Sequence, residues 1–130
     1  MDIVVTTPKS EMPTAEQEAR DCIAAAEKGL DPCYFRTFRR KPKGLEGGSR
    51  IFYVEDGYIR GFATVREVVH ADMECDTTGR DWGAGFHAIM PATSWQWIDP
   101  IPMRGFQGFR YFTPPDSLRV IAGWRDPRPR

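Results

Sequence analysis

The stretch from Trp95 to Tyr111 holds the residue types from which a ligand site could be built. It contains two Trp, two Phe, one Tyr, two Arg and two Gly. Flat rings stack on planar ligands, and arginines bind anions or lie over such rings. The candidate ligand contacts in this stretch are Trp95, Arg104, Gln107, Arg110 and Tyr111. The structural alternative is that the Trp pair caps a small core, the glycines form bends and the arginines are solvated.

A second group of candidates lies between Arg36 and Arg50, where six basic residues accompany one acid, Glu46. Arginine binds phosphate through two parallel hydrogen bonds, whereas lysine acts as a point charge. The candidate phosphate-contacting residues are Arg36, Thr37, Arg39 and Lys41. Alternation along a strand would direct Thr37, Arg39 and Lys41 to one side. The alternative is a solvated strand edge that its charges protect from aggregation.

Patterns for metal and cofactor chemistry are incomplete. His70, Asp72, Glu74 and Cys75 match no standard metal-ligand spacing. The glycines of residues 83–88 match a relaxed dinucleotide fingerprint, but no buried strand precedes them and no long helix follows. No Ser-His-Asp or Cys-His arrangement can be assembled. We therefore expect neither a metal nor a cofactor.

Composition restricts the class of protein. A chain of 130 residues fits one domain, and its net charge of +0 argues against strong non-specific binding to duplex nucleic acid. Three cysteines without a C-x-x-C motif argue against a disulfide framework or a zinc finger. No apolar run approaches the ~18 residues of a membrane span, and the N-terminus lacks signal-peptide features. We expect a cytoplasmic protein without membrane contact; no feature specifies the oligomeric state.

The periodicity predicts one main helix near the N-terminus, after a first strand at residues 3–6. Thr14 with Gln17 forms a capping-box pattern, and Gly29 provides a stop. The expected buried stripe consists of Ala15, Ala19, Cys22, Ile23, Ala26 and Leu30.

The clearest local signal is Asp56-Gly57, a two-residue hairpin turn between β-rich segments. The predicted pairs are Glu55 with Tyr58, Val54 with Ile59, Tyr53 with Arg60, and Phe52 with Gly61. That register places Phe52, Val54, Ile59, Gly61, Ala63 and Val65 on one face. The opposite face carries aromatic residues too, so we expect a sheet that is covered on both sides.

Further strands are predicted at residues 34–38, 82–90, 101–112 and 118–124, with a helical turn after Pro91. On either a helix or a turn, Trp95 and Trp97 would point in different directions. The predicted fold is α+β: a small, mostly antiparallel β-barrel of five to six strands with one main N-terminal helix. Residues 1–124 would form one domain and residues 125–130 a flexible tail.

The order of these elements, the R-I-F-Y-V-E-D-G-Y-I-R-G-F hairpin and the late W-I-D-P-I-P-M-R-G-F-Q-G-F-R-Y segment resemble the PUA-like superfamily, nearest its ASCH and EVE branches. The resemblance implies a single PUA-like domain with a small barrel and flanking helices. It also implies binding of RNA, or recognition of a modified or flipped base, between the barrel and the helix. By this resemblance Arg36, Thr37 and Arg39 would face the ligand.

Some small ASCH proteins are amidohydrolases that act on acylated cytidine. They use a Lys followed closely by a Thr, with a distant Glu. Here Arg36 precedes Thr37 and Lys41 follows it, while Glu67 and Glu74 are the available acids. Neither acid lies in a recognisable motif, so whether the protein is an enzyme stays open.

The sequence therefore predicts a binding module that takes RNA or another nucleotide-like ligand in a basic and aromatic cleft. One alternative is a small amidohydrolase acting on a modified nucleoside. The other is a protein-interaction domain with exposed aromatic residues.

Overall fold

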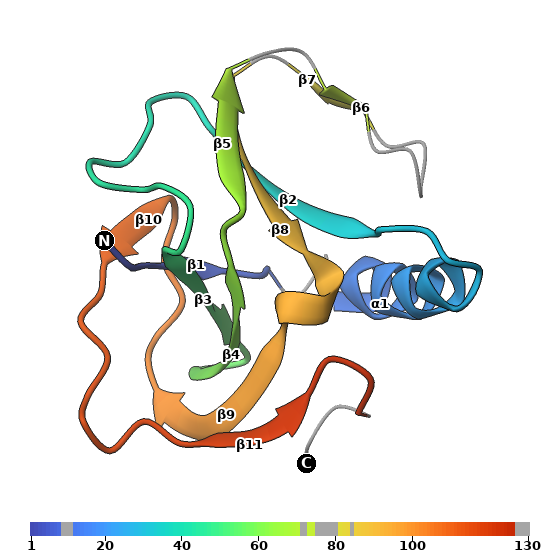
Figure 1. The fold of residues 1–130 in the computed structure, drawn as a ribbon. Coiled ribbons are helices and arrows are strands. Elements are labelled where there is room, and N and C mark those ends of the chain that lie inside the picture. The colour runs from blue at the N-terminus through green and yellow to red at the C-terminus, as the bar shows by residue number, and fades with distance from the viewer. Residues whose placement is uncertain (9–11, 71–72, 75–80, 84, 127–130) are drawn as a thin grey trace.

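The computed structural model describes residues 1–8, 12–70, 73–74, 81–83 and 85–126 (Figure 1). The described part of the chain is mostly β, with 45% of its residues in strands and 14% helical. The elements that precede the hairpin are β1 (Ile3–Thr6), α1 (Met12–Glu27) and β2 (Cys33–Phe38). They are followed by β3 (Arg50–Glu55), β4 (Tyr58–Thr64), β5 (Glu67–His70), β6 (Met73–Glu74), β7 (Asp81–Gly83) and β8 (Phe86–Pro91). The remaining elements are the 3-10 turn η2 (Ala92–Ser94), β9 (Gln96–Pro102), β10 (Phe109–Tyr111) and β11 (Val120–Gly123).

The strands form open sheets. The largest sheet has the order β10-β1-β3-β4-β9-β11; a second has the order β2-β8-β5; and β6 pairs with β7. Only the β1–β3 pair is parallel among the described strands. The prediction of a closed barrel is therefore wrong. The sheet ends in two short strands, β10 and β11, which pair only with β1 and β9 in the described chain.

Both faces of the large sheet are covered, as the hairpin pattern predicted. The first core cluster lies between the two larger sheets and is built from Ile3, Val5, Phe38, Leu45, Ile51, Ala63, Val65, Ala88 and Met90. The second covers the opposite face and is built from Val4, Phe52, Val54, Ile59, Phe62 and Ile98. Alternation along β1 supplies both clusters, because successive side chains point to opposite faces.

The β3–β4 hairpin has the predicted turn. Asp56 and Gly57 have φ of 51° and 83°, as a two-residue turn of this kind requires. The first two predicted pairs, at Glu55–Tyr58 and Val54–Ile59, are confirmed.

A β-bulge at Arg60 then changes the register of the hairpin. Tyr53 pairs with Gly61, and Phe52 pairs with Phe62. A one-residue shift exchanges the faces of all following side chains. Phe62 therefore joins Phe52 in the second core cluster. Ala63 and Val65, which were predicted to share a face with Phe52, face the first cluster instead. The predicted single face for Phe52 and Ala63 is wrong for this reason.

The helix α1 is confirmed as an element, but its predicted start is wrong. It begins at Met12, so Thr14 lies within it. The Gln17 amide donates to Asp21 at 2.8 Å instead of capping the N-terminus. Cys22 is buried as expected, whereas Leu30 is 62% exposed, because the chain leaves the helix before reaching it.

Two other predicted elements are divided. Residues 82–90 form the end of β7 and most of β8, and residues 101–112 form the end of β9, a loop and β10. The predicted helical turn after Pro91 is confirmed as η2. Residues 127–130 of the predicted tail lie outside the described residues. No helix in the described chain is both long and apolar enough to cross a bilayer.

Candidate ligand-binding site

Four aromatic side chains from β2, β3, β9 and the residue after η2 form one group, which we name the aromatic cluster: Tyr34, Tyr53, Trp95 and Trp97. Trp95 is at its centre. Its ring lies 5.5 Å from that of Tyr53, 6.5 Å from that of Tyr34 and 5.1 Å from that of Trp97, centroid to centroid. The contacts of Trp95 with Tyr34 and Trp97 are edge-to-face, an arrangement that aromatic rings favour.

The backbone around η2 explains why the two tryptophans meet. Trp95 has extended geometry, with φ of −62° and ψ of 132°, and β9 begins at the next residue. Residues two apart in extended chain point to the same side. The expectation that Trp95 and Trp97 point in different directions is therefore wrong.

Gly61 makes room for the Trp95 ring. A Cβ atom on Gly61 would lie 2.5 Å from Cζ2 of Trp95 and 2.7 Å from the Gln96 carbonyl oxygen. Neither distance is compatible with a side chain. The Arg60 bulge brings Gly61 to this position, opposite Trp97 on β9.

The indole nitrogen of Trp95 is a buried donor that lacks an acceptor. Nε1 of Trp95 is inaccessible to solvent, and it makes no hydrogen bond with the described residues. Most buried polar groups in folded proteins are hydrogen-bonded. An unmatched buried donor costs about 1–3 kcal/mol relative to a satisfied one, so its presence in a half-buried aromatic group requires an explanation.

Burial and nearby charged residues shift the pKa values of the two tyrosine hydroxyl groups of the cluster. Burial raises the pKa of Tyr53 to about 12; Arg36 opposes that rise, while Glu55 and Glu18 add to it. Burial also raises the pKa of Tyr34, with smaller contributions from Cys22, Tyr53 and Glu18. Both phenols are therefore neutral at physiological pH.

Arg36 lies on the same face of β2 as Tyr34, because the two residues are two apart on that strand. Its side chain is half-buried on β2, and its charge acts on the Tyr53 hydroxyl. Of the predicted site residues, Arg36 and Trp95 are thus brought to the same region.

Thr37 lies on the other face of β2. It pairs with His87, and its Oγ1 lies 2.9 Å from Nδ1 of that histidine. His87 is fully buried, and Thr37 is its hydrogen-bond partner. Alternation along β2 separates Thr37 from its neighbour Arg36.

Arg39 and Lys41 lie beyond the end of β2, in a segment of residues 39–49 that we name the basic loop. Arg39, Arg40, Lys41 and Lys43 are all exposed. None of these four cations forms an ion pair with the described residues. The ion pairs among those residues join Arg50 to Asp2 and Arg66 to Asp31.

The remaining predicted site residues lie on β10 or in the loop before it, and they do not share one side of the sheet. Tyr111 is 50% exposed, and its hydroxyl oxygen accepts a hydrogen bond of 2.9 Å from the Lys43 backbone amide. Arg110 points to the opposite side, where its guanidinium lies 4.2 Å from the centroid of the Phe106 ring. Arg104 and Gln107 are exposed in the loop that precedes β10. The structure therefore places Tyr111 beside the basic loop and Arg110 on the other side of the sheet.

Sequence reasoning missed Tyr34, Tyr53, Glu18 and Glu55 as site residues. The placement of Tyr53 on the face opposite Phe52 was the one available signal. Among the acids considered for catalysis, Glu67 is exposed on β5, and the side chain of Glu74 is not described.

No group of three metal-ligating side chains is present among the described residues. Asp72 and Cys75 of the pattern considered above lie outside them.

Comparison with known proteins gives no match to a family model, to a curated protein or to a solved structure.

Proposed function

We propose that this protein binds a nucleobase-containing ligand, either a modified nucleoside or one base of a nucleic acid, at the aromatic cluster. The observation that carries the proposal is the buried Nε1–H of Trp95, which has no acceptor among the described residues. Base carbonyl oxygens and ring nitrogens are acceptors of the kind that this donor lacks.

The energetic argument concerns specificity. Nε1 is inaccessible in the unbound protein, so a ligand reaches it only when a neighbouring ring moves aside. The unbound protein already bears the cost of the unmatched donor, so a ligand that then supplies an acceptor gains a hydrogen bond without a new desolvation penalty for Nε1. A ligand of similar shape that lacks the acceptor forms no hydrogen bond with Nε1 and leaves the donor unmatched. Sites that hold a buried polar group discriminate most strongly against such analogues.

The neighbouring residues suit a flat, polar ligand. Tyr34, Tyr53 and Trp95 are half-buried and offer ring surfaces for stacking. The phenols stay neutral, so each can both donate and accept. Arg36 adds a positive charge, which favours electron-rich edges and phosphate over cationic ligands.

The position of α1 also supports the proposal. Figure 1 shows α1 beside η2, the turn that precedes Trp95, and Glu18 and Cys22 of this helix both raise the pKa of Tyr34. The resemblance to PUA-like proteins predicts a ligand between the barrel and the helix, but the sheets of this chain are open. The resemblance stays a prediction, and the aromatic cluster is the part of the sheet that we propose for the ligand.

The test replaces Trp95 with Phe, which keeps a ring but removes the N–H group. The four common nucleoside monophosphates and short single-stranded RNA and DNA are titrated at millimolar or lower concentration, with thermal shift as the readout, because a ligand that binds the folded state raises the Tm. We expect at least one probe to stabilise the wild-type protein, and Trp95→Phe to weaken that binding by about tenfold.

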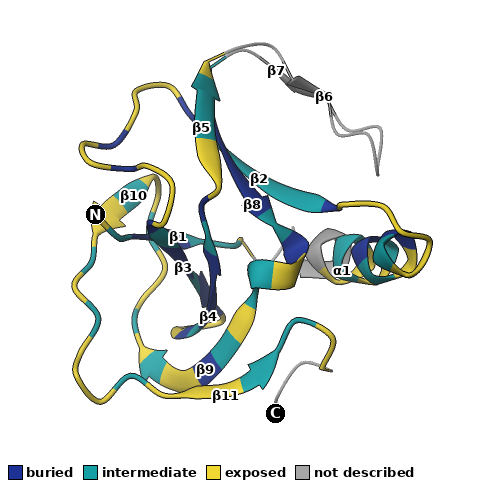
Figure 2. Cartoon of the chain, in the orientation of Figure 1, coloured by how far each residue is buried: buried dark blue, intermediate teal, exposed yellow. Residues whose placement is uncertain are grey.

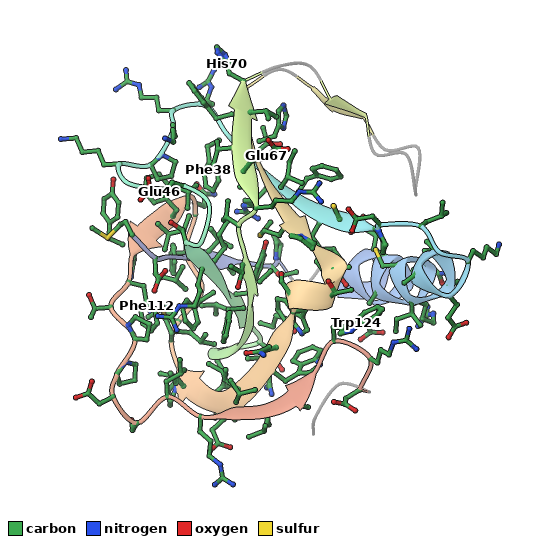
Figure 3. The ribbon with its side chains drawn as sticks, viewed as in Figure 1. Phe38, Glu46, Glu67, His70, Phe112 and Trp124 are labelled. Atoms are coloured by element: carbon green, nitrogen blue, oxygen red, sulfur yellow. The ribbon has the colours of Figure 1, made fainter. Side chains whose placement is uncertain are left out.

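Trp124→Phe is the matched control. Trp124 is half-buried, its ring lies 4.8 Å from the guanidinium of Arg125, and it makes no ring contact with the cluster in the described chain. Figure 3 labels it near the C-terminal end of the described chain, and Gly123 before it pairs with Gln96 after Trp95, so the control removes an indole N–H group from the same neighbourhood. Equal binding by wild type and Trp95→Phe, or no stabilisation by any probe, would overturn the proposal.

A further inference from the structure

The basic loop differs from an ordinary solvated loop because it is held in place at several points. Pro42, Leu45 and Ser49 are buried, and Figure 2 shows dark blue stretches within the mostly exposed segment that joins β2 to β3. Leu45 is fully inaccessible and belongs to the first core cluster. The cations between and around these anchors are therefore displayed from a fixed backbone.

Hydrogen bonds fix the middle and the end of the loop. Near its end, the Gly48 amide donates to the Val65 carbonyl at 2.8 Å, and the Val65 amide donates to the Ser49 carbonyl at 2.7 Å. The Ser49 hydroxyl accepts from the Glu46 amide at 3.1 Å. In its middle, the Lys43 amide donates to the Tyr111 hydroxyl. Little conformational entropy remains to be lost when the loop binds a partner.

The charge of the loop is unbalanced. It carries Arg39, Arg40, Lys41 and Lys43 against one acid, Glu46, although the whole chain has a net charge of +0. Because none of the four cations has an ion-pair partner among the described residues, an incoming anion need not displace an internal one. A local concentration of positive charge attracts polyanions even on a neutral protein.

Tyr111 adds a flat surface next to these cations. Its ring is half-exposed, its hydroxyl is held by Lys43, and it meets the Phe109 ring edge-to-face at 5.5 Å. A fixed, exposed ring beside phosphate-binding cations is the arrangement by which proteins hold unpaired bases. It distinguishes this surface from one that would bind a membrane, because the apolar side chains of the loop, Pro42 and Leu45, are buried.

We propose that the basic loop and Tyr111 bind the sugar-phosphate backbone and one base of a single-stranded nucleic acid. Arg39, Lys41 and their neighbours contact successive phosphates, and the Tyr111 ring stacks on a base. This surface is separate from the aromatic cluster, although β2 connects them: Arg36 and Arg39 are three residues apart, about 10 Å of extended chain. The inference deepens the proposed function, since it makes the ligand a strand instead of a free nucleoside.

The test measures binding of fluorescein-labelled oligouridylate to wild-type protein and to Arg39→Ala/Lys41→Ala by fluorescence anisotropy across a salt series. We expect the double variant to bind about tenfold more weakly, with a log K against log salt slope smaller by about 1.4, because each lost phosphate contact lowers it by about 0.7 on a single strand. Lys28→Ala/Arg119→Ala is the control. It removes one exposed Lys and one exposed Arg, from the end of α1 and from the segment before β11, at the opposite edge of the sheet from β10.

A second pair of variants tests the ring. Tyr111→Leu removes the stacking surface and should weaken binding about tenfold. Tyr111→Phe keeps the ring but loses the hydrogen bond to Lys43, so it should weaken binding less. Equal losses in the two would overturn the stacking role.

Three results would overturn the inference as a whole: equal effects of the two double variants, an unchanged salt slope, or equally tight binding of poly-glutamate, which would show a surface for acidic proteins. The proposed function is tested separately. Trp95→Phe should weaken nucleoside monophosphates and oligouridylate alike, whereas Arg39→Ala/Lys41→Ala should weaken the oligonucleotide and leave the monophosphates within about twofold of wild type. If only Trp95→Phe weakens binding, the proposal for the basic loop fails. If only Arg39→Ala/Lys41→Ala weakens binding, the proposal for the aromatic cluster fails.

Discussion

The aromatic cluster and the basic loop use opposite means to hold functional groups in place. In the cluster, Tyr34, Tyr53 and Trp95 pack against one another and against the first core, and a buried donor remains unmatched. In the loop, the functional side chains touch little, and the backbone is fixed by buried anchors such as Leu45 and by hydrogen bonds.

The difference teaches what each region could recognise. A buried unmatched donor rewards one hydrogen-bonding pattern, so the cluster suits selection among ligands of similar shape. Exposed cations are screened by salt and tolerate many sequences, so the loop suits affinity and rapid association. The two regions share a core but should respond to different substitutions.

The largest expected effect comes from removing the anchor of the loop. Leu45→Ala deletes a fully buried side chain from the first core cluster and should lower the free energy of unfolding by about 3 kcal/mol. Urea denaturation measures this change. Leu118→Ala, at a half-buried position beside the second cluster, should cost clearly less. If Leu45→Ala also impaired nucleotide binding by the folded protein, the two regions would not be independent.

The second prediction concerns Gly61→Ala, which should disturb the aromatic cluster and leave the basic loop unchanged. Gly61→Ala forces a methyl group against the Trp95 ring and the Gln96 carbonyl, so the ring must move, and stability should fall by about 2 kcal/mol. Near-ultraviolet circular dichroism reports the displacement of the tryptophans. Gly123→Ala on β11 is the control, because its added carbon would lie 3.6 Å from the Asp126 carboxylate, an ordinary contact. Similar spectra for both variants would mean that Gly61 does not position Trp95.

The last expected effect appears only at alkaline pH and concerns the stability that the buried Tyr53 hydroxyl contributes. Burial raises the pKa of Tyr53 to about 12, above the ordinary value of 10.0 that applies in the unfolded chain. The folded state therefore holds its proton longer. The resulting stability is fully present below about pH 10 and is lost as the pH rises towards about 12. Between these values Tyr53→Phe should lose roughly 2 kcal/mol less stability than wild type.

Urea denaturation at several alkaline pH values measures this difference, with Tyr58→Phe as the control because Tyr58 is 41% exposed. Parallel stability curves for wild type and Tyr53→Phe would show that the hydroxyl of Tyr53 is not desolvated.

Local patterns gave a useful part of the fold in advance. The Asp56-Gly57 turn, the strand at residues 34–38 and the turn after Pro91 each follow from nearest-neighbour chemistry, and all three are confirmed. The helix was identified by its periodicity, although its start was misplaced. Boundaries are less predictable because several caps of similar energy compete.

The candidate site was only partly predictable. Arg36 and Trp95 were identified as candidates and lie in one region, but the Arg60 bulge and the extended backbone at Trp95 were not anticipated. Both features depend on the pairing of β4 with β9, which is far away in the sequence. The expected single cleft was instead divided, with Thr37 and Arg110 directed to other faces.

The sequence by itself determined the local elements, the cationic character of residues 39–43 and the concentration of aromatic residues after Ser94, because these depend only on residue types and short-range spacing. Only the tertiary structure decided whether the sheet closes, which face each side chain takes after the bulge, and that Nε1 of Trp95 is buried without an acceptor among the described residues. These properties depend on long-range strand pairing and on the space that neighbouring elements leave, and neither is encoded in any one segment of the chain.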